Sequence, residues 1–136
     1  MNDKNNCVFC KIVAGDVPST KIYEDDYTLA FLDIRPVNAG HTVVIPKEHF
    51  PAMGQPPDEI LATTFVTAKK IMVAIRRATN CDYVALSVIG LDVPHFHIHL
   101  IPRHNSDALA HFWPTKSYEN DALKQEVADK IKKELE

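Results

Sequence analysis

Apolar and polar residues alternate along five short segments of this 136-residue chain, at 22–24, 27–34, 41–46, 83–88 and 95–102. Successive side chains of a β-strand point to opposite faces, so alternation with a period of two predicts five strands. In the segment 27–34 we expect Leu29, Phe31 and Ile34, or the residues between them, to face the core. Gly40 is expected to permit a sharp entry into the third strand, because glycine adopts backbone angles that strain other residues.

Two longer segments carry the three- and four-residue spacing of amphipathic helices. The segment 58–79 is predicted to be the longer helix, with Asp58 as a cap at its start and Asn80 just beyond its end. A second helix is predicted near the end of the chain, with an outer face rich in Lys and Glu. The apolar faces comprise Leu61, Phe65, Ala68, Met72 and Ile75 in the first helix, and Leu123, Val127, Ile131 and Leu135 in the second.

The fifth alternating segment is unusual because one of its two faces is made of histidine. The imidazole face comprises His95, His97 and His99, and the apolar face comprises Phe96, Ile98 and Leu100. On a helix, with about 100° between successive residues, the apolar set would not close into a stripe. We therefore interpret the segment as a strand with a histidine face.

A buried row of imidazoles needs a hydrogen-bond partner, a metal or water for each ring. Three interpretations of the histidine face are open: an exposed strand in which histidine recurs without a role, a purely structural metal site, or a site that handles phosphate. The consistently apolar opposite face argues against the exposed strand. We favour the phosphate site.

The composition is that of a globular protein, with 46% hydrophobic and 24% charged residues. A chain of this length fits one domain whose core needs no disulfides. The start of the chain has no apolar signal-peptide core, and no run of about 18 apolar residues occurs, so we expect a cytoplasmic protein without a membrane span. A net charge of −3 argues against a groove for a nucleic acid polymer and is compatible with a mononucleotide ligand.

Three cysteines are too few, and odd in number, for the disulfide framework of a secreted protein, so we expect reduced thiols. Cys7 and Cys10 have the spacing of half a zinc site, and His49 and His95 are candidates for the other two ligands. The alternative is a pair of small, half-buried thiols at a turn. A redox pair is less expected, because no βαβ pattern follows the cysteines.

The histidine face resembles the signature of the histidine-triad (HIT) superfamily, His-x-His-x-His followed by apolar residues. Three further segments resemble the family in the same order: 7–18 its opening segment, and 30–34 with 40–49 its central hairpin. The resemblance runs from about 7 to 103 and fades in the tail and helix at 104–136. It implies a single HIT domain over residues 1–136 and a homodimer. The expected fold is α+β, a five-stranded antiparallel sheet with a long helix and a C-terminal helix.

The resemblance also implies roles for individual residues. His97 would attack an α-phosphate, while His99 and His41, the family's fourth histidine, would orient or contact it. The predicted catalytic set is His41, His95, His97 and His99. The predicted nucleotide-binding set is Phe9, Ile12, Val17, Asp33, Ile34 and Gly90. The predicted ligands of a structural zinc are Cys7, Cys10, His49 and His95.

Two of these roles have simpler alternatives. Asp33 would accept the hydroxyls of a ribose, and it could instead cap a turn before Arg35. Phe9 and its apolar neighbours around a predicted turn at Gly15 would form a wall for a purine base, and they could instead be ordinary core. For His97, the second ring nitrogen must be held by an acceptor, expected to be a backbone carbonyl, to fix the tautomer.

The loop before the histidines departs from the family pattern. Family hydrolases usually carry Gly-Gln-x-Val there, with the Gln or a following Ser placed to assist the leaving group. Here Leu91 and Asp92 follow the retained Gly90. A carboxylate about 4 Å from the phosphate would repel it by about 4 kcal/mol at an effective dielectric of about 20. Asp92 therefore points away, acts as a protonated acid, or pairs with a cationic leaving group.

The function predicted from these motifs is hydrolysis or transfer at the α-phosphate of purine nucleotide conjugates of the adenosine 5'-phosphoramidate type, through a nucleotidyl-histidine. A diadenosine polyphosphate hydrolase is the enzymatic alternative. A nucleotide-binding HIT domain with little turnover is the alternative from another class.

In the tail, Phe112 and Trp113 are expected to cover a pocket or an interface, or to be buried in the core.

Overall fold

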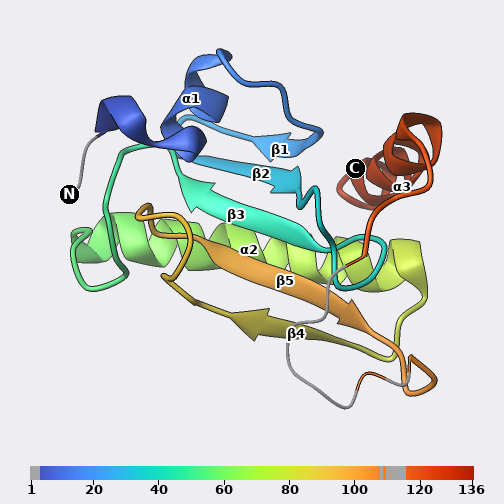
Figure 1. The fold of residues 1–136 in the computed structure, drawn as a ribbon. Coiled ribbons are helices and arrows are strands. Elements are labelled where there is room, and N and C mark those ends of the chain that lie inside the picture. Colours follow the sequence, from blue (N-terminus) through green and yellow to red (C-terminus); the bar gives the residue numbers. More distant parts are fainter. Residues whose placement is uncertain (1–3, 108, 110–115) are drawn as a thin grey trace.

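The computed structural model describes residues 4–107, 109 and 116–136, and its centre is an antiparallel sheet (Figure 1). In these described residues the strands are β1 (Lys21–Glu24), β2 (Thr28–Leu32), β3 (Thr42–Pro46), β4 (Tyr83–Ser87) and β5 (Ile98–Arg103). They lie in the order β1-β2-β3-β5-β4, and each neighbouring pair is antiparallel. The α+β class and the five-stranded sheet expected from the sequence are confirmed.

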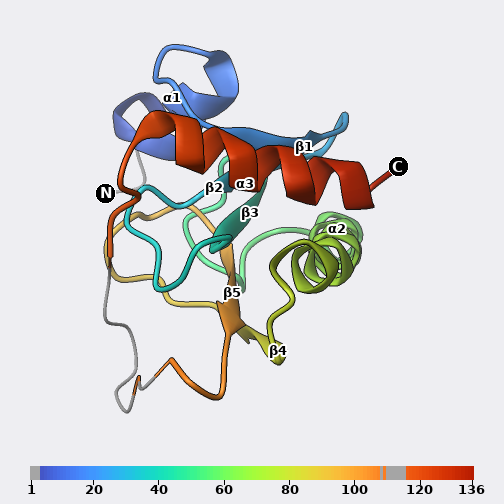
Figure 2. The same cartoon turned by 90° about the vertical axis from the view of Figure 1, so that its right-hand side faces the viewer.

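Two amphipathic helices, α2 (Asp58–Thr79) and α3 (Asp121–Glu134), share one core with the sheet (Figure 2). Helix α2 packs on β3 and β5, while α3 packs on α2 and β1. The predicted helix at 58–79 is confirmed at both ends, and Asn80 ends it in the left-handed conformation with φ 52°. The buried residues of this first core include Ala68, Ile71, Ile75, Phe96, Ile98, Leu100, Ala128 and Ile131.

Two details of these helices differ from expectation. Pro57 and not Asp58 is the N-cap of α2, and Asp58 is the first helical residue, where its charge favours the positive end of the helix. Leu123 stays 39% exposed while Ala128 is buried. Four residues advance a helix by about 400°, so residues spaced by four drift around the axis and Leu123 leaves the face that holds Ile131.

The other face of the sheet carries a short helix that alternation did not predict, α1 (Val8–Ala14). The sulfur of Cys7 caps it by accepting the amide N–H of Cys10, and Gly15 ends it with φ 86°. Phe9 and Cys10 are buried in a second apolar cluster with side chains of β2 and β3. Seven residues are too few for periodicity to separate a helix from an apolar turn.

The histidine segment is a strand only in its second half, so the predicted start at His95 is wrong. Strand β5 begins at Ile98 because its ladder partners run out there. The pairing with β3 extends only to Val44 opposite Ile98, and β4 ends at Ser87 opposite His99.

The alternation of side chains along this segment is confirmed all the same. Phe96, Ile98 and Leu100 lie in the first core, on the side of α2. His99 lies directly opposite Val43, whose side chain belongs to the second cluster, on the side of α1. The histidine face therefore lies beside α1, and the apolar face lies beneath α2.

Strand β2 is buried along its whole length but ends before Ile34. Ile34 is 72% exposed, so the expectation that it faces the core is wrong. The cause is a turn: the carboxylate of Asp33 accepts the amide N–H of Arg35, and Pro36 follows.

The loop between β2 and β3 turns at Gly40 and is held by hydrogen bonds of the Asn38 side chain. Gly40 has φ 100°, and a Cβ there would lie 2.9 Å from Cγ2 of Thr79, so its expected role is confirmed. The amide of Asn38 donates to the carbonyl of Pro102, and Lys116 donates to the side-chain oxygen of Asn38.

Phe112 and Trp113 lie outside the described residues. No helix of the described chain is long and apolar enough to cross a membrane.

Candidate active site and metal cluster

His97 lies on the histidine face, and the main chain fixes the orientation of its ring. Its Nδ1 lies 2.6 Å from the carbonyl oxygen of His95. A carbonyl can only accept, so Nδ1 carries the proton and Nε2 keeps the lone pair. The backbone acceptor expected from the sequence is present, and Nε2 of His97 carries the lone pair of a neutral ring.

A chain of hydrogen bonds fixes the tautomers of His99, on this face, and of the neighbouring His41. The amide N–H of Val37 donates to Nδ1 of His41 at 3.0 Å, so His41 carries its proton on Nε2. That nitrogen lies 2.9 Å from Nδ1 of His99 and donates to it. A neutral His99 therefore carries its proton on Nε2. At this nitrogen His99 is a hydrogen-bond donor, whereas Nε2 of His97 carries a lone pair.

Burial keeps these rings neutral. It lowers the pKa of His41 to about 4, against the opposing charge of Asp33. Burial, with His97 and His41 nearby, lowers the pKa of His99 to about 3. Burial also lowers the pKa of His97, although its contact with the His95 carbonyl and the charges of Asp33 and Asp92 oppose the shift. At neutral pH a neutral imidazole can attack without first losing a proton.

The turn cap considered for Asp33 is observed, and its contact with a ribose stays a prediction. One carboxylate oxygen accepts the amide N–H of Arg35 at 2.8 Å, which is the turn cap. The other lies 3.6 Å from Nε2 of His41 and 3.8 Å from Nδ1 of His99. One oxygen of Asp33 is thus directed at the histidine face, where a ribose hydroxyl could reach it.

The four predicted zinc ligands come together beside the histidine face, with their donor atoms within 4.8 Å of one another. Nδ1 of His95 lies 3.4 Å from Sγ of Cys7 and 3.5 Å from Sγ of Cys10. Nδ1 of His49 lies 3.2 Å from Sγ of Cys10. A tetrahedral zinc, about 2.3 Å from sulfur and about 2.1 Å from nitrogen, separates such donors by about 3.6 Å. The donor set and its spacing fit zinc.

The surroundings of this cluster argue against reactive thiols. Burial, followed by the neighbouring Cys7, raises the pKa of Cys10 to about 11, whereas a reactive cysteine has a lowered pKa. Burial lowers the pKa of His95 to about 4, so its ring is neutral, as ligation requires.

The rings of the two cluster histidines are held differently. Nε2 of His95 donates to the carbonyl of Pro46 at 2.9 Å, which directs the lone pair of Nδ1 toward the sulfurs. Nε2 of His49, in contrast, is buried without a hydrogen-bond partner in the described chain. The ring of His49 contacts the sulfur of Cys10 through Nδ1 and stands edge-on to the ring of His95, with centroids 5.2 Å apart. A metal bound by this ring would further fix its orientation.

The apolar residues predicted to contact the nucleotide divide into two groups. Phe9 stands edge-on to His97 with ring centroids 5.0 Å apart, and Ile12 and Val17 pack in the same cluster as Phe9. Ile34 and Gly90 are exposed on the loops before β3 and before the histidine segment. The structure brings the first group to the histidine face and leaves the second on neighbouring loops. Their contact with a nucleotide stays a prediction.

The two residues that depart from the family pattern are exposed. Leu91 is 86% exposed and fills no part of a core. Asp92 is also exposed, and its charge is near enough to His97 to oppose the lowering of the His97 pKa. A carboxylate therefore stands near His97 on the solvent side.

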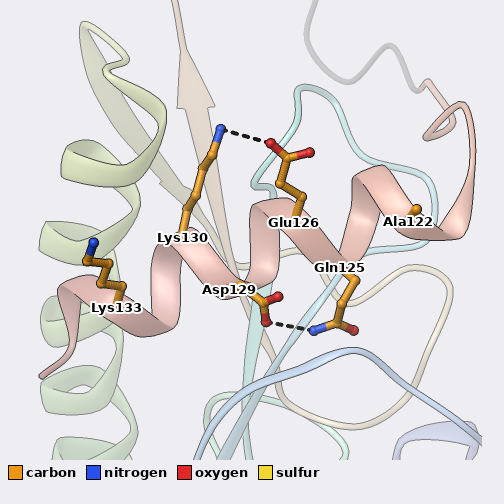
Figure 3. Close-up of a pocket in the computed structure, with 6 residues that line it drawn as sticks. All are labelled: Ala122, Gln125, Glu126, Asp129, Lys130 and Lys133. Atoms are coloured by element: carbon orange, nitrogen blue, oxygen red, sulfur yellow. Dashed lines mark hydrogen bonds and ion pairs between the residues drawn. The ribbon is translucent and has the colours of Figure 1, made fainter.

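A hollow along α3 is lined by residues of that helix and by none of the histidine face (Figure 3). Its polar side chains pair along the helix: Lys130 lies 3.6 Å from Glu126, and the amide of Gln125 donates to Asp129 at 2.9 Å. Pairs at this spacing are ordinary on an exposed helix. Beyond such pairs its charged lining consists of Lys133 alone, and we do not treat the hollow as a site.

Backbone groups complete the histidine face, and sequence reasoning missed two of them. The N–H of Val37 sets the tautomer of His41, and the carbonyl of Pro46 sets that of His95. No pattern of side-chain types encodes such groups. The carbonyl that holds His97 was expected from the sequence, because fixing the tautomer of its ring requires an acceptor at the second nitrogen.

Comparisons with known proteins agree with this geometry. The HIT domain model matches residues 14–106. The chain is 39% identical to "Protein hit" of Bacillus subtilis over 99% of this chain and 98% of that protein. It is 40% identical to adenosine 5'-monophosphoramidase hnt1 of Schizosaccharomyces pombe over 93% of this chain and 99% of that one. Among solved structures, a zinc-bound histidine triad family protein from Mycobacterium smegmatis has a TM-score of 0.86 at 32% identity, covering 98% and 95% of the two chains.

Proposed function

This chain belongs to the HIT domain family, and on that premise we propose that it hydrolyses purine nucleotide conjugates at the α-phosphate. The substrate type is an adenosine 5'-phosphoramidate, in which an amine is bonded to the phosphorus. The observation that carries the proposal is the contact of 2.6 Å between Nδ1 of His97 and the carbonyl of His95. This contact leaves the lone pair of a buried, neutral ring on Nε2.

The reaction begins when Nε2 of His97 attacks the α-phosphorus. A new bond forms between Nε2 and phosphorus, and the bond from phosphorus to the amine nitrogen breaks. The amine leaves with that electron pair and takes a proton from solvent. The phosphorylated ring is cationic, and its Nδ1–H still donates to the carbonyl of His95. Water then attacks the phosphorus and releases adenosine monophosphate, a proton and neutral His97.

Two neighbouring groups support the phosphate and the ribose in this proposal. His99, with its proton on Nε2, donates to a phosphate oxygen, and its tautomer is maintained by His41 and the amide of Val37. The carboxylate oxygen of Asp33 that faces the two histidines accepts a ribose hydroxyl. Phe9, Ile12 and Val17 provide apolar surface for the base. Ile34 and Gly90 complete the predicted binding set.

The test is turnover on a panel of nucleotide conjugates, followed by separation of the nucleotide products. We expect release of adenosine monophosphate from an adenosine 5'-phosphoramidate with kcat/KM at least about tenfold above that for diadenosine polyphosphates, a difference of about 1.4 kcal/mol. Turnover confined to the polyphosphates would instead identify the alternative enzyme. Calorimetry with adenosine monophosphate supplies the binding measurement.

A nucleotide-binding domain with little turnover is the second candidate. One observation favours it: exposed Leu91 and Asp92 replace the residues that assist the leaving group in family hydrolases. Nucleotide binding by calorimetry without product from any conjugate on the panel would establish this candidate and exclude the hydrolase.

We also propose a structural zinc, one per chain, held by Cys7, Cys10, His49 and His95. Four protein ligands leave no open position for water, so the metal would supply structure and no activated nucleophile. The three thiols are all unpaired and buried, which agrees with a protein kept in the reducing cytoplasm.

The homodimer that the resemblance implies would use the free edge of the sheet. Strand β4 is an edge strand, and Leu86 on it and Val66 and Val73 on α2 are exposed by 42%, 63% and 44%. An antiparallel edge can pair with a second copy of itself around a two-fold axis.

Light scattering should give twice the chain mass of 15.3 kDa. Leu86→Lys should yield the monomer, whereas the control Leu123→Lys, on α3, should not.

A further inference from the structure

His95 belongs to the metal cluster through its ring and to the histidine face through its main chain. Its Nδ1 lies 3.4 Å and 3.5 Å from the sulfurs of Cys7 and Cys10. Its carbonyl oxygen lies 2.6 Å from Nδ1 of His97. One residue thus links the four-ligand cluster to the proposed nucleophile.

We propose that His95 is a positioning residue for the reaction, through which the cluster of Cys7, Cys10 and His49 holds His97 in its nucleophilic tautomer. The cluster fixes the ring of His95, the fixed ring holds the main chain of residue 95, and the carbonyl there keeps the proton of His97 on Nδ1. This inference rests on the proposed function, because it takes His97 as the nucleophile.

The main chain at 95–97 depends on such contacts because it lies outside the β ladder. Strand β5 begins only at Ile98. Before it, the amide of His95 donates to Val93 at 2.9 Å, and the amide of Phe96 donates to the carbonyl of Phe50 at 2.6 Å. The ring of His95, held by the sulfurs on one side and by Pro46 on the other, is thus a principal anchor of this segment.

The same cluster also holds the opposite side of His97. Phe9 lies between the two cysteines in α1, and its ring stands edge-on to His95 and His97, with centroids 5.9 Å and 5.0 Å away. The sulfur of Cys7 caps α1. Loosening the cluster would therefore free His97 at its hydrogen-bond acceptor and at its ring contact together.

The functional consequence is a loss of turnover without a comparable loss of binding. The carbonyl of His95 does not touch the substrate; it sets which nitrogen of His97 carries the proton. When the orientation of the carbonyl is lost, part of the population shifts its proton to Nε2, and those molecules cannot attack. Removing an outer-shell partner of a metal ligand typically costs about ten- to hundredfold in affinity or activity, and we expect a loss of that order here. The KM should change far less than kcat.

The experiment compares zinc-loaded wild type with Cys10→Ser, His95→Ala and His95→Cys, and uses Cys81→Ser as the matched control. Cys81 is also a buried free thiol but is not one of the four ligands. The readouts are zinc per chain by elemental analysis, the tautomer of His97 by long-range ¹H–¹⁵N correlation, and kcat and KM separately. The wild type and Cys81→Ser should show His97 protonated on Nδ1.

We expect Cys10→Ser and His95→Ala to lose zinc, to show a mixture of His97 tautomers, and to lose kcat by about tenfold or more. His95→Cys supplies a different zinc ligand and so restores the anchor that orients the main-chain carbonyl at residue 95. It should therefore regain zinc, the Nδ1–H tautomer and most of the kcat that His95→Ala loses. If the imidazole of His95 acted directly on the substrate, His95→Cys would bind zinc and remain as inactive as His95→Ala, and the proposal would be overturned.

A zinc-free variant that keeps the Nδ1–H tautomer would also overturn the proposal. Should Cys10→Ser or His95→Ala unfold, the comparison of wild type with His95→Cys still decides it, because both bind zinc. The tautomer and the metal content are measured without substrate, so they report on this inference even if no phosphoramidate is hydrolysed. Absence of turnover in the wild type would count against the proposed function alone.

Discussion

Two groups of side chains on the α1 side of the sheet look alike in composition and differ in what surrounds their nitrogens. The cysteine cluster is Cys7, Cys10, His49 and His95; the relay cluster is Asp33, His41 and His99. In both, the donor atoms lie within 4.8 Å of one another. Residue type and proximity alone would therefore make each a candidate metal site.

The partners of the ring nitrogens separate the two groups. In the relay cluster, a backbone N–H occupies Nδ1 of His41, and the Nε2–H of that ring is directed at His99. In the cysteine cluster, the lone pair of His95 faces two sulfurs, and one nitrogen of His49 has no partner in the described chain. The comparison teaches that the partner of one imidazole nitrogen determines whether the other has a lone pair available to a metal or donates a hydrogen bond.

The largest effect is expected where the two clusters meet, at His97. Replacing His97 by Ala should lower kcat by about a thousandfold or more while nucleotide binding stays within about threefold, because the nucleophile contributes mainly to the transition state. Steady-state kinetics and calorimetry measure the two quantities. His104→Ala, a histidine beyond β5, is the control and should change neither. Near-normal turnover of the His97 variant would exclude the covalent mechanism.

The relay cluster should make the fold sensitive to acid. The pKa of His41 is lowered from 6.5 to about 4, and that of His99 from 6.5 to about 3. The unfolded chain therefore takes up protons below about pH 6.5 while the folded chain does not, and stability present above that pH is lost as the pH falls. Each ring should cost up to about 2 kcal/mol between about pH 7.5 and about pH 5.

Urea unfolding at the two pH values measures this loss. His41→Asn is the informative variant, because an amide cannot titrate. Whatever its stability at neutral pH, its free energy of unfolding should fall less on acidification than that of the wild type, by up to about 2 kcal/mol. An equal fall in both proteins would show that the acid sensitivity has another source.

The cysteine cluster should differ from the relay cluster in metal content. Protein purified without added metal should contain about one zinc per chain, and Cys10→Ser should contain less than about a tenth of that and melt at a lower temperature. His41→Asn, in the relay cluster, should retain its zinc. Elemental analysis and thermal melts test both. Less than about a tenth of an equivalent in the wild type would refute the zinc site.

Side-chain patterns predicted much of the fold because they follow from burial. The alternation at Phe96, Ile98 and Leu100 and the spacing within α2 reflect which side chains leave water, and the structure confirms both. Boundaries were less predictable. Strand β5 starts three residues late because its neighbours end, and a neighbour's length is not written in the strand's own sequence.

The site was predictable in its residue types and not in its connections. The sequence indicated the cysteines, the histidines and Asp33, and these do come together. It did not indicate that Val37 and Pro46 would set tautomers, because every residue carries a backbone carbonyl and every non-proline residue a backbone N–H. Helix α1 was missed for a related reason: its end depends on the left-handed Gly15 and its start on a sulfur cap.

The smallest expected effect concerns Asp92, which is exposed near His97 and belongs to neither cluster. An exposed carboxylate acts through a screened charge, so its influence should be about 1 kcal/mol, or about fivefold in rate. If it selects a cationic amine as the leaving group, Asp92→Asn should lower kcat/KM for amine-bearing conjugates by that factor and raise it for anionic polyphosphates. Asp26→Asn, which removes the same charge on the turn between β1 and β2, is the control and should leave both rates unchanged. Unchanged rates in Asp92→Asn on both substrates would show that the carboxylate points away from the leaving group.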